Sequence, residues 1–227
     1  MEEISFKIIV ADPSHKKYSE IITEEMANSA KARGTGIAKR TPAYIETKMD
    51  EGKAVIALTS DGVWAGFCYI EAWGHGKYVA NSGLIVSPEF RKYGLARKIK
   101  QEVFKLSRLK FPESKIFGLT TGAAVMKINS ELGYIPVSYS DLTDDQEFWK
   151  GCQSCINFEI LTSKNRQNCL CTAMLYDPLA KKNQMAEMAL REDFKKDLKL
   201  FDRWVRLKKY VMLKLNKTKD SALNLFL

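Results

Sequence analysis

The sequence predicts an α/β protein, and three observations indicate this class. Strand-like runs are interleaved with segments of helical periodicity over roughly the first 140 residues. The tripeptide Ser-Asp-Gly at 60–62 separates two apolar runs and is typical of a tight hairpin turn. The run 81–86 passes through a glycine-containing turn directly into an amphipathic helix. Together these patterns predict helices packed against a β-sheet.

The first elements are a strand and two helices. Residues 5–11 alternate between apolar and polar side chains, which predicts a strand. Apolar residues then recur at helical spacing within 14–32, so a first helix is expected there. Thr41 supplies an N-cap and Pro42 a favoured first helical residue, which predicts a second, short helix ending near Gly52.

The later elements alternate between strands and helices. Strands are expected at residues 54–59, 63–72, 78–86, 115–120 and 134–139. A helix is expected to begin at Gly94, because apolar residues recur after it at helical spacing. A shorter helix is expected over 122–132 and ends at Gly133. The resulting order is β-α-α-β-β-β-α-β-α-β.

The composition is that of a globular domain. The chain has 227 residues, enough to bury a core, of which 45% are apolar and 28% charged. No apolar run of about 18 residues occurs in the sequence, and the N-terminal Met-Glu-Glu-Ile lacks the basic-then-apolar pattern of a secretion signal. We therefore expect a cytoplasmic protein with no membrane partner. Its five cysteines should be reduced thiols or metal ligands.

The net charge of +9 is unevenly distributed. Residues 181–220 hold thirteen Lys/Arg and six Asp/Glu, so this segment carries +7 and the rest of the chain +2. An apolar stripe predicts a long amphipathic helix there, formed by Leu190, Phe194, Leu198, Phe201 and Val205. A solvated basic face is favoured over an RNA, DNA or anionic-membrane contact. Nucleic-acid binding is thus not the expected function.

The hexapeptide 91–96 is the most informative motif. It reads Arg91, Lys92, Tyr93, Gly94, Leu95, Ala96 and lies between a strand and a helix. The first turn of a helix has unpaired backbone N–H groups and the positive end of the helix dipole, so this turn is suited to an anion. Gly94 lets the backbone approach a phosphate closely. The motif therefore predicts a phosphate-binding loop.

The pattern Arg-x-x-Gly-x-Ala after Leu84-Ile85-Val86-x-Pro resembles the acyl-CoA pyrophosphate loop of the GNAT N-acetyltransferase superfamily. The resemblance covers residues 4–143 and implies a mixed central sheet splayed between its fourth and fifth strands. It implies that the backbone around Leu84, Ile85 and Val86 pairs with the pantetheine arm of acetyl-CoA or another acyl-CoA. The N–H groups of residues 91–96 would then hold the pyrophosphate.

The acid and base depart from the superfamily pattern. Many GNAT enzymes carry a glutamate on the fourth strand and a tyrosine shortly before a Gly-Phe pair. The corresponding positions here are Ala80 and Asn129, and neither side chain titrates near neutral pH. Ser82 and Thr120 are the candidates to hold a proton-accepting water or the leaving thiolate. Two further candidates, Glu71 and Tyr78, are expected to be structural.

Two segments narrow the resemblance to N-acetylglutamate synthases. The first contains Gly-Leu-Thr-Thr at 118–121 and then Leu-Gly-Tyr-Ile-Pro-Val at 132–137. The second is residues 36–45. This similarity implies acyl transfer to the α-amino group of glutamate or a related amino acid, with a protein lysine or another small amine as the alternative. Lys39, Arg40 and Thr121 would bind the acceptor, arginine being the better carboxylate clamp.

Four of the five cysteines form a second motif. Cys152 and Cys155 are separated by two residues, and Cys169 and Cys171 by one, on the predicted arms of a hairpin at 156–161 and 170–176. This spacing is typical of a structural zinc ribbon with four thiolates. The alternative is that the cysteines are small buried residues.

The sequence thus predicts three parts. They are an acyltransferase domain at 1–143, a Cys-rich zinc hairpin at 144–180 and a basic helical segment at 181–227. The alternative from another class is a zinc-ribbon and basic-helix module that binds nucleic acid or protein. No aromatic platform for stacking bases is evident, which favours the enzyme. A homo-oligomer remains an open alternative.

Overall fold

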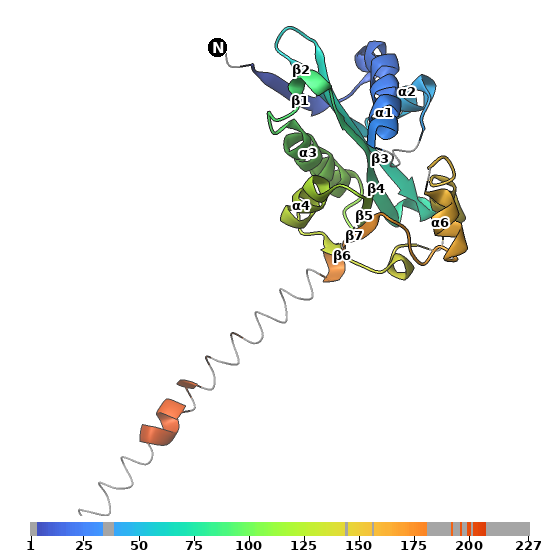
Figure 1. The fold of residues 1–227 in the computed structure, drawn as a ribbon. Helices are drawn as coiled ribbons and strands as arrows, with labels where there is room; N and C mark the ends of the chain where they lie inside the picture. Colours follow the sequence, from blue (N-terminus) through green and yellow to red (C-terminus); the bar gives the residue numbers. More distant parts are fainter. Residues whose placement is uncertain are drawn as a thin grey trace, which may run out of the picture. The chain divides into compact units, whose positions relative to one another are not determined.

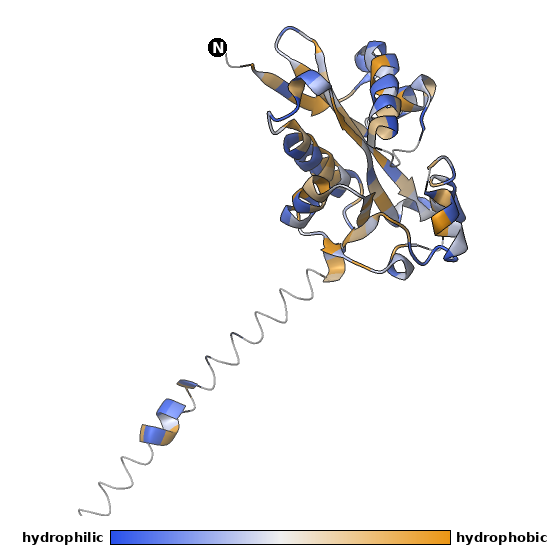
Figure 2. Ribbon diagram, in the orientation of Figure 1, coloured by the Kyte–Doolittle hydropathy of each residue, from blue (hydrophilic) through white to orange (hydrophobic). Residues whose placement is uncertain are grey.

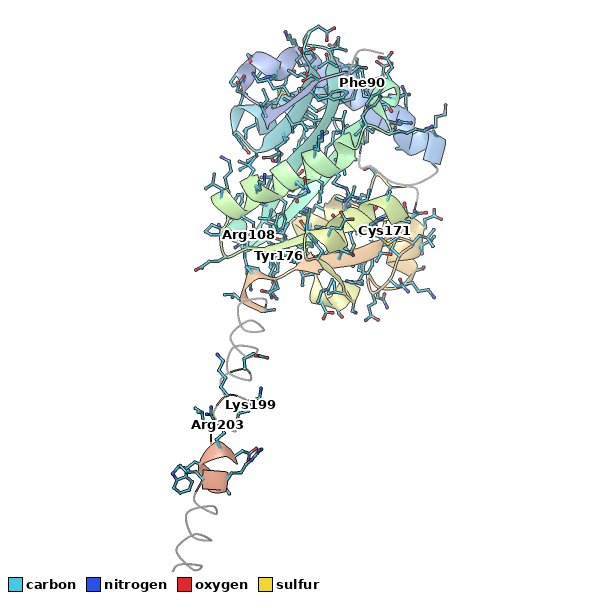
Figure 3. The ribbon with its side chains drawn as sticks, turned by 90° about the vertical axis from the view of Figure 1, so that its left-hand side faces the viewer. Phe90, Arg108, Cys171, Tyr176, Lys199 and Arg203 are labelled. Atoms are coloured by element: carbon cyan, nitrogen blue, oxygen red, sulfur yellow. The ribbon has the colours of Figure 1, made fainter. Side chains whose placement is uncertain are left out.

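The computed structural model describes residues 4–33, 39–143, 145–155, 157–180, 192, 196, 199–200 and 202–207. The chain divides into two compact units, Met1–Pro178 and Leu179–Leu227. In the second unit, the described residues, Lys199 and Arg203 among them, are helical (Figure 3). Of the stripe that predicted the basic helix, only Val205 lies within the described residues, and it is exposed.

The first unit is built on a seven-stranded sheet. Its strands are β1 (Phe6–Val10), β2 (Ala54–Thr59), β3 (Trp64–Trp73), β4 (Tyr78–Val86), β5 (Lys115–Thr120), β6 (Ile135–Pro136) and β7 (Thr172–Tyr176). Their spatial order is β1-β2-β3-β4-β5-β7-β6. All neighbours are antiparallel except β4 and β5, which are parallel. The predicted mixed sheet is confirmed.

Helices cover both faces of this sheet. They are α1 (Ser19–Arg33), α2 (Pro42–Asp50), α3 (Leu95–Lys110), α4 (Ala123–Glu131), α5 (Gln146–Lys150) and α6 (Phe158–Ser163). Short 3₁₀ turns are η1 (Pro13–Tyr18), η2 (Gly74–Gly76), η3 (Pro88–Phe90) and η4 (Tyr139–Asp141). α3 and α4 lie on one side of the sheet, and α1, α2 and α6 lie on the other (Figure 1). Among the described residues, no helix has the length and apolar character needed to cross a membrane.

The core follows this layering. Apolar residues of α3 such as Ile99 and Val103 pack on one face of the sheet, and those of α1 and α2 pack on the other. A third cluster joins Phe117 and Leu175 to Trp149 and Leu161, residues of α5 and α6. Figure 2 shows hydrophobic strands between helices that have hydrophilic outer surfaces. The three clusters fix the strands that carry the site.

A bulge in β4 opens the middle of the sheet. Phe67 pairs with Ile85 and Tyr69 with Ser82, so β4 contains one residue more than β3 between these pairs. Gly83 lies in this bulge with φ +65°, and a Cβ there would lie 2.4 Å from the Tyr69 ring. A residue other than glycine would therefore be strained and would clash.

β4 and β5 diverge just before this bulge. Their pairing ends at Ala80 and Phe117, and β5 then pairs only with β7 in the sheet as described. The segment 81–86 thus exposes one backbone edge of β4. This is the splay expected between the fourth and fifth strands of the fold.

The C-terminal part of the first unit differs from expectation. The predicted strand at 134–139 shortens to Ile135–Pro136, because η4 begins at Tyr139. The predicted Cys-rich hairpin is wrong: its first arm is helix α6, and its second arm is β7, which inserts between β5 and β6. Alternation over so short a run is not distinguishable from helical i, i+3 spacing. Residues 144–178 therefore belong to the same compact unit as 1–143.

Side chains of α3 contact Tyr176, the last residue of β7. The Arg108 guanidinium of α3 lies 5.5 Å from the centroid of the Tyr176 ring, and Figure 3 labels both side chains. The Phe104 ring meets Tyr176 edge to face at 5.0 Å. Because α3 thus contacts the last strand as well as β3 and β4, it ties the inserted strand to the rest of the sheet.

Candidate active site

A cleft of about 520 Å³ lies where β4 and β5 diverge. Its floor comes from β3, β4 and β5, and one side comes from the segment 148–155. Of the residues predicted from sequence, it is lined by Arg40, Ser82, Leu84, Thr120, Thr121, Cys152, Cys155 and Cys171. The cleft therefore brings together the predicted acceptor, pantetheine and catalytic positions from segments that are distant in sequence.

Glu71 lies on the floor of this cleft. It is on β3 directly opposite Ala80 of β4, so the two side chains lie on the same face of the sheet. The superfamily glutamate is expected at the position of Ala80. Glu71 therefore places a carboxylate next to that position, from the neighbouring strand.

Three side chains surround the Glu71 carboxylate and form with it the ion cluster. The Tyr44 hydroxyl donates a hydrogen bond to Oε1, and the Lys48 ammonium lies 3.0 Å from Oε2. One terminal nitrogen of Arg40 lies 3.7 Å from Oε1. When Glu71 is ionised, the cluster carries one more positive than negative charge.

Burial shifts the pKa values of Glu71 and Lys48 in the ion cluster. Burial raises the pKa of Glu71 to about 7, partly offset by the Arg40 charge. Burial lowers the pKa of Lys48. A carboxyl with a pKa near neutrality is suited to accept a proton from an ammonium group and release it to solvent.

Arg40 connects the ion cluster to the sheet. Its Nε donates to the Tyr69 hydroxyl at 2.9 Å, and its guanidinium lies 4.9 Å from the centroid of the Tyr44 ring. The backbone carbonyl of Lys39 accepts from Nη1 at 3.2 Å. Because a guanidinium has five N–H donors, these contacts leave donors available to a ligand in the cleft. The Lys39 side chain does not line the cleft.

The predicted phosphate loop follows the free edge of β4. Lys92 and Gly94 have φ of +75° and +74°, and α3 begins at Leu95. A Cβ at Gly94 would meet no atom within 4 Å, so the backbone here borders open space. Leu95 and Ala96 occupy the first two helical positions, at which N–H groups have no acceptor within the helix. This geometry is suited to a phosphate group, and binding of the pyrophosphate by residues 91–96 stays a prediction.

The Arg91 side chain positions this loop. Its guanidinium donates to Glu25 Oε1 at 2.8 Å and to Ser29 Oγ at 3.1 Å, both on α1. Tyr93 packs edge to face on Phe6 at 5.7 Å. Arg91 and Tyr93 thus connect the loop to the first unit's N-terminal elements. Arg91 contributes mainly this anchoring, because its charge is paired with Glu25.

A second polar cluster is buried beneath β4. It consists of Asn81, Lys100, Ser107 and Tyr134, and we call it the buried lysine cluster. The Lys100 ammonium and the Tyr134 hydroxyl both donate to Asn81 Oδ1, at 3.2 and 3.1 Å, and Asn81 Nδ2 donates to Ser107 Oγ at 2.7 Å. Among the described residues, Lys100 forms no ion pair with a carboxylate. Burial lowers the pKa of Lys100 to about 8.

The cysteines do not form the predicted zinc site. Cys152, Cys155, Cys169 and Cys171 line a small cavity of about 30 Å³ together with Leu119, Tyr139 and residues of α6. In the described part of the chain, no three His, Cys, Asp or Glu side chains are arranged to hold a metal ion. Burial, reinforced by the neighbouring thiols, raises the pKa of Cys152 to about 11 and that of Cys171 to about 12. These thiols fit small packed residues, the alternative left open above.

Sequence reasoning undervalued Glu71 and did not identify the cleft's apolar side. Trp73, Phe117 and Phe148 line it, and Phe148 comes from α5, beyond the predicted domain boundary. The available signal was a single acidic residue inside a ten-residue run that is otherwise uncharged. A charge in such a run is buried and therefore has a partner.

Comparison with known proteins supports the fold. No protein-family model and no curated protein sequence matches the chain. Among solved structures, N-acetylglutamate synthase from Neisseria gonorrhoeae, complexed with coenzyme A and N-acetylglutamate, superposes with a TM-score of 0.54 and 15% identity. The match covers 78% of this chain and 36% of that one, so the chain spans about a third of the synthase.

Two other acetyltransferases match over most of their length. A putative acetyltransferase from Salmonella typhimurium, solved with acetyl-CoA, gives a TM-score of 0.53 at 17% identity and covers 77% of this chain and 94% of that one. A GNAT-family acetyltransferase from Staphylococcus aureus gives 0.54 at 13% identity, with 77% and 99% covered. At such identities the likeness shows the fold alone. With its splayed β4–β5 pair and its glycine loop before α3, the chain has the GNAT fold.

Proposed function

We propose that the protein is an N-acyltransferase that transfers an acetyl or other acyl group from acyl-CoA to a small amine. One observation carries this proposal: the free β4 edge leads from the cleft that contains Glu71 to the glycine loop at 91–96. An unpaired strand edge offers backbone groups to an amide-containing chain such as pantetheine. The loop offers N–H groups to the pyrophosphate.

The reaction is direct transfer without an acylated enzyme. Glu71, as its carboxylate, accepts one proton from the acceptor ammonium and passes it to solvent. The amine nitrogen then attacks the thioester carbonyl carbon, so that a C–N bond forms and the C–S bond breaks. The nitrogen loses its second proton to the departing CoA sulfur. The products are the amide, CoA thiol and one proton released to solvent.

The acceptor is proposed to be an α-amino acid. Arg40 and Glu71 lie close together on one side of the cleft, where they fit a carboxylate and an ammonium on adjacent carbons. Glutamate is one member of this class of acceptor. The free thiols fit a reducing compartment, and we propose that the protein acts in the cytoplasm.

The test uses the purified full chain. Acetyl-CoA and succinyl-CoA are each mixed with a panel of amino acids and simple amines, and release of CoA thiol is followed. We expect turnover with at least one amino acid and binding of CoA by calorimetry. Absence of CoA binding in the folded protein would contradict the acyltransferase assignment.

A further inference from the structure

The charged side chains of the cleft are few and lie on one side. Among the described residues, Arg40 and Glu71 are its only charged lining groups. Lys48 lies behind Glu71 and does not line the cleft. The cleft therefore offers one cation and one carboxylate to an acceptor.

An aromatic wall faces the rest of the cleft. It consists of Trp73, Phe117 and Phe148. The Trp73 and Phe117 rings stack at 5.8 Å, and Phe148 meets them edge to face at 5.2 and 4.9 Å. Phe117 and Phe148 are buried in the third core cluster, so the wall is held rigidly. It presents apolar surface with no hydrogen-bond partner for a charged ligand group apart from the Trp73 indole.

The ion cluster and the wall lie on the same face of the sheet. Glu71 and Trp73 are two residues apart on β3, so their side chains point in the same direction about 7 Å apart. An amino acid with its ammonium at Glu71 and its carboxylate at Arg40 would direct its side chain along this face. A second carboxylate directed at the aromatic wall would lose its hydration without gaining a partner there.

We propose that the acceptor is an α-amino acid with a bulky apolar or aromatic side chain and a single carboxylate, rather than glutamate. This inference rests on the proposed acyltransferase function and refines its substrate class. Arg40 binds the carboxylate, Glu71 receives the ammonium, and the wall of Trp73, Phe117 and Phe148 contacts the side chain. An apolar side chain gains free energy from this burial, whereas a charged one loses it.

The experiment compares acceptors under identical conditions. With saturating acetyl-CoA, kcat/KM is measured for phenylalanine, leucine, glutamate and phenethylamine, which is the phenylalanine skeleton without its carboxylate. We expect phenylalanine or leucine to exceed both glutamate and phenethylamine by about tenfold or more. Calorimetry with phenylalanine and glutamate in the presence of CoA checks the same order of affinity.

Two variants locate the effect. Trp73→Leu should lower kcat/KM for phenylalanine severalfold without changing the KM for acetyl-CoA, whereas Trp73→Arg should raise the relative use of glutamate. Phe104→Leu, which changes an aromatic residue outside the cleft, is the matched control and should leave the preference unchanged. Equal or better use of glutamate by the unaltered protein would overturn the inference while leaving the acyltransferase function intact. Failure of every amine, together with no CoA binding, would overturn both.

Discussion

Glu71 and Lys100 lie on opposite faces of the same pair of strands, and each is a charged side chain removed from water. Glu71 is on the face of Ala80, and Lys100 contacts Asn81, the next residue along β4. Glu71 has two cations and a hydroxyl around it and borders the cleft. Lys100 is 2% exposed and has only neutral partners.

This difference separates a group placed for chemistry from one placed for structure. The cations around Glu71 exceed its charge, so the ion cluster can still bind an anionic group of a substrate. Lys100 donates a hydrogen bond to Asn81 Oδ1, and no carboxylate among the described residues balances its charge, so burial lowers the pKa of the lysine. Burial shifts the pKa of each group toward neutrality, and of the two only Glu71 lines the cleft. A perturbed pKa alone therefore does not identify the catalytic group.

The largest effect on activity is expected from a substitution of Glu71, which borders the cleft. Glu71→Gln keeps the shape of the side chain and removes the proton acceptor. We expect kcat/KM for the amino-acid acceptor to fall about 10²- to 10⁴-fold, the usual contribution of a general base, with little change in acetyl-CoA affinity. Steady-state kinetics and CoA calorimetry measure the two effects. Activity within threefold of the unaltered protein would remove Glu71 from the mechanism.

The pH dependence tests the same residue in a second way. Because the base form of Glu71 is required and burial raises its pKa to about 7, kcat/KM should fall below about pH 7 and level off above it. Arg40 lowers this pKa, so Arg40→Ala should move the rise to higher pH. Measuring kcat/KM from pH 5.5 to 8.5 locates the pH at which it rises, in the unaltered protein and in Arg40→Ala. The same low-pH limb in Glu71→Gln would assign the titration to another group.

Arg40→Ala should also weaken acceptor recognition. Loss of a charge-assisted contact is expected to cost on the order of 2–4 kcal/mol in kcat/KM for amino acids. Lys39→Ala is the matched control, since its side chain does not line the cleft. Amines without a carboxylate should lose less than amino acids. If all acceptors lose equally, Arg40 acts only through the pKa of Glu71.

Gly94→Val tests binding of the acyl donor. This substitution leaves Glu71 and Lys100 unchanged. The branched side chain would enter the open space beside the loop at a positive φ that strains it. We expect the Kd of CoA to rise about tenfold or more, with Gly94→Ala intermediate. Thermal unfolding monitors the cost to the fold. Unchanged CoA affinity in a folded variant would place the pyrophosphate elsewhere.

The smallest effect on activity is expected in the buried lysine cluster, where a substitution should change stability instead. Lys100→Met removes a buried charge and keeps most of the packing volume. The folded-state pKa of Lys100 is about 8, against an ordinary value of 10.5. Burial of the charged lysine therefore destabilises the protein fully below pH 8, and this destabilisation disappears as the pH rises from about 8 to 10.5. The variant should therefore be more stable at pH 7 by about 1–3 kcal/mol, and this gain should shrink as pH rises. Urea unfolding at pH 7, 8.5 and 9.5 measures it, and a destabilised variant would show that the ammonium is needed.

The sequence by itself determined the elements that depend on neighbouring residues. The loop at 91–96, the Thr41 cap of α2 and the hairpin turn before β3 follow from local spacing and backbone preference. The β4–β5 splay was available through the superfamily resemblance. Local rules are sufficient for these features because the groups that decide them lie within a few residues of each other.

The acceptor side of the cleft was decided by the tertiary structure. Glu71 lies opposite Ala80 only through the β3–β4 register, and Arg40, Tyr44 and Lys48 reach it from another element. Phe148 joins Trp73 because β7 inserts beside β5 and brings the segment before it over the sheet. The spacing of the four cysteines predicted a zinc site. In the structure α6 lies between the two cysteine pairs in the chain, and no metal-binding group is found among the described residues. Such contacts depend on strand register and on burial summed over distant segments, and spacing along the chain encodes neither.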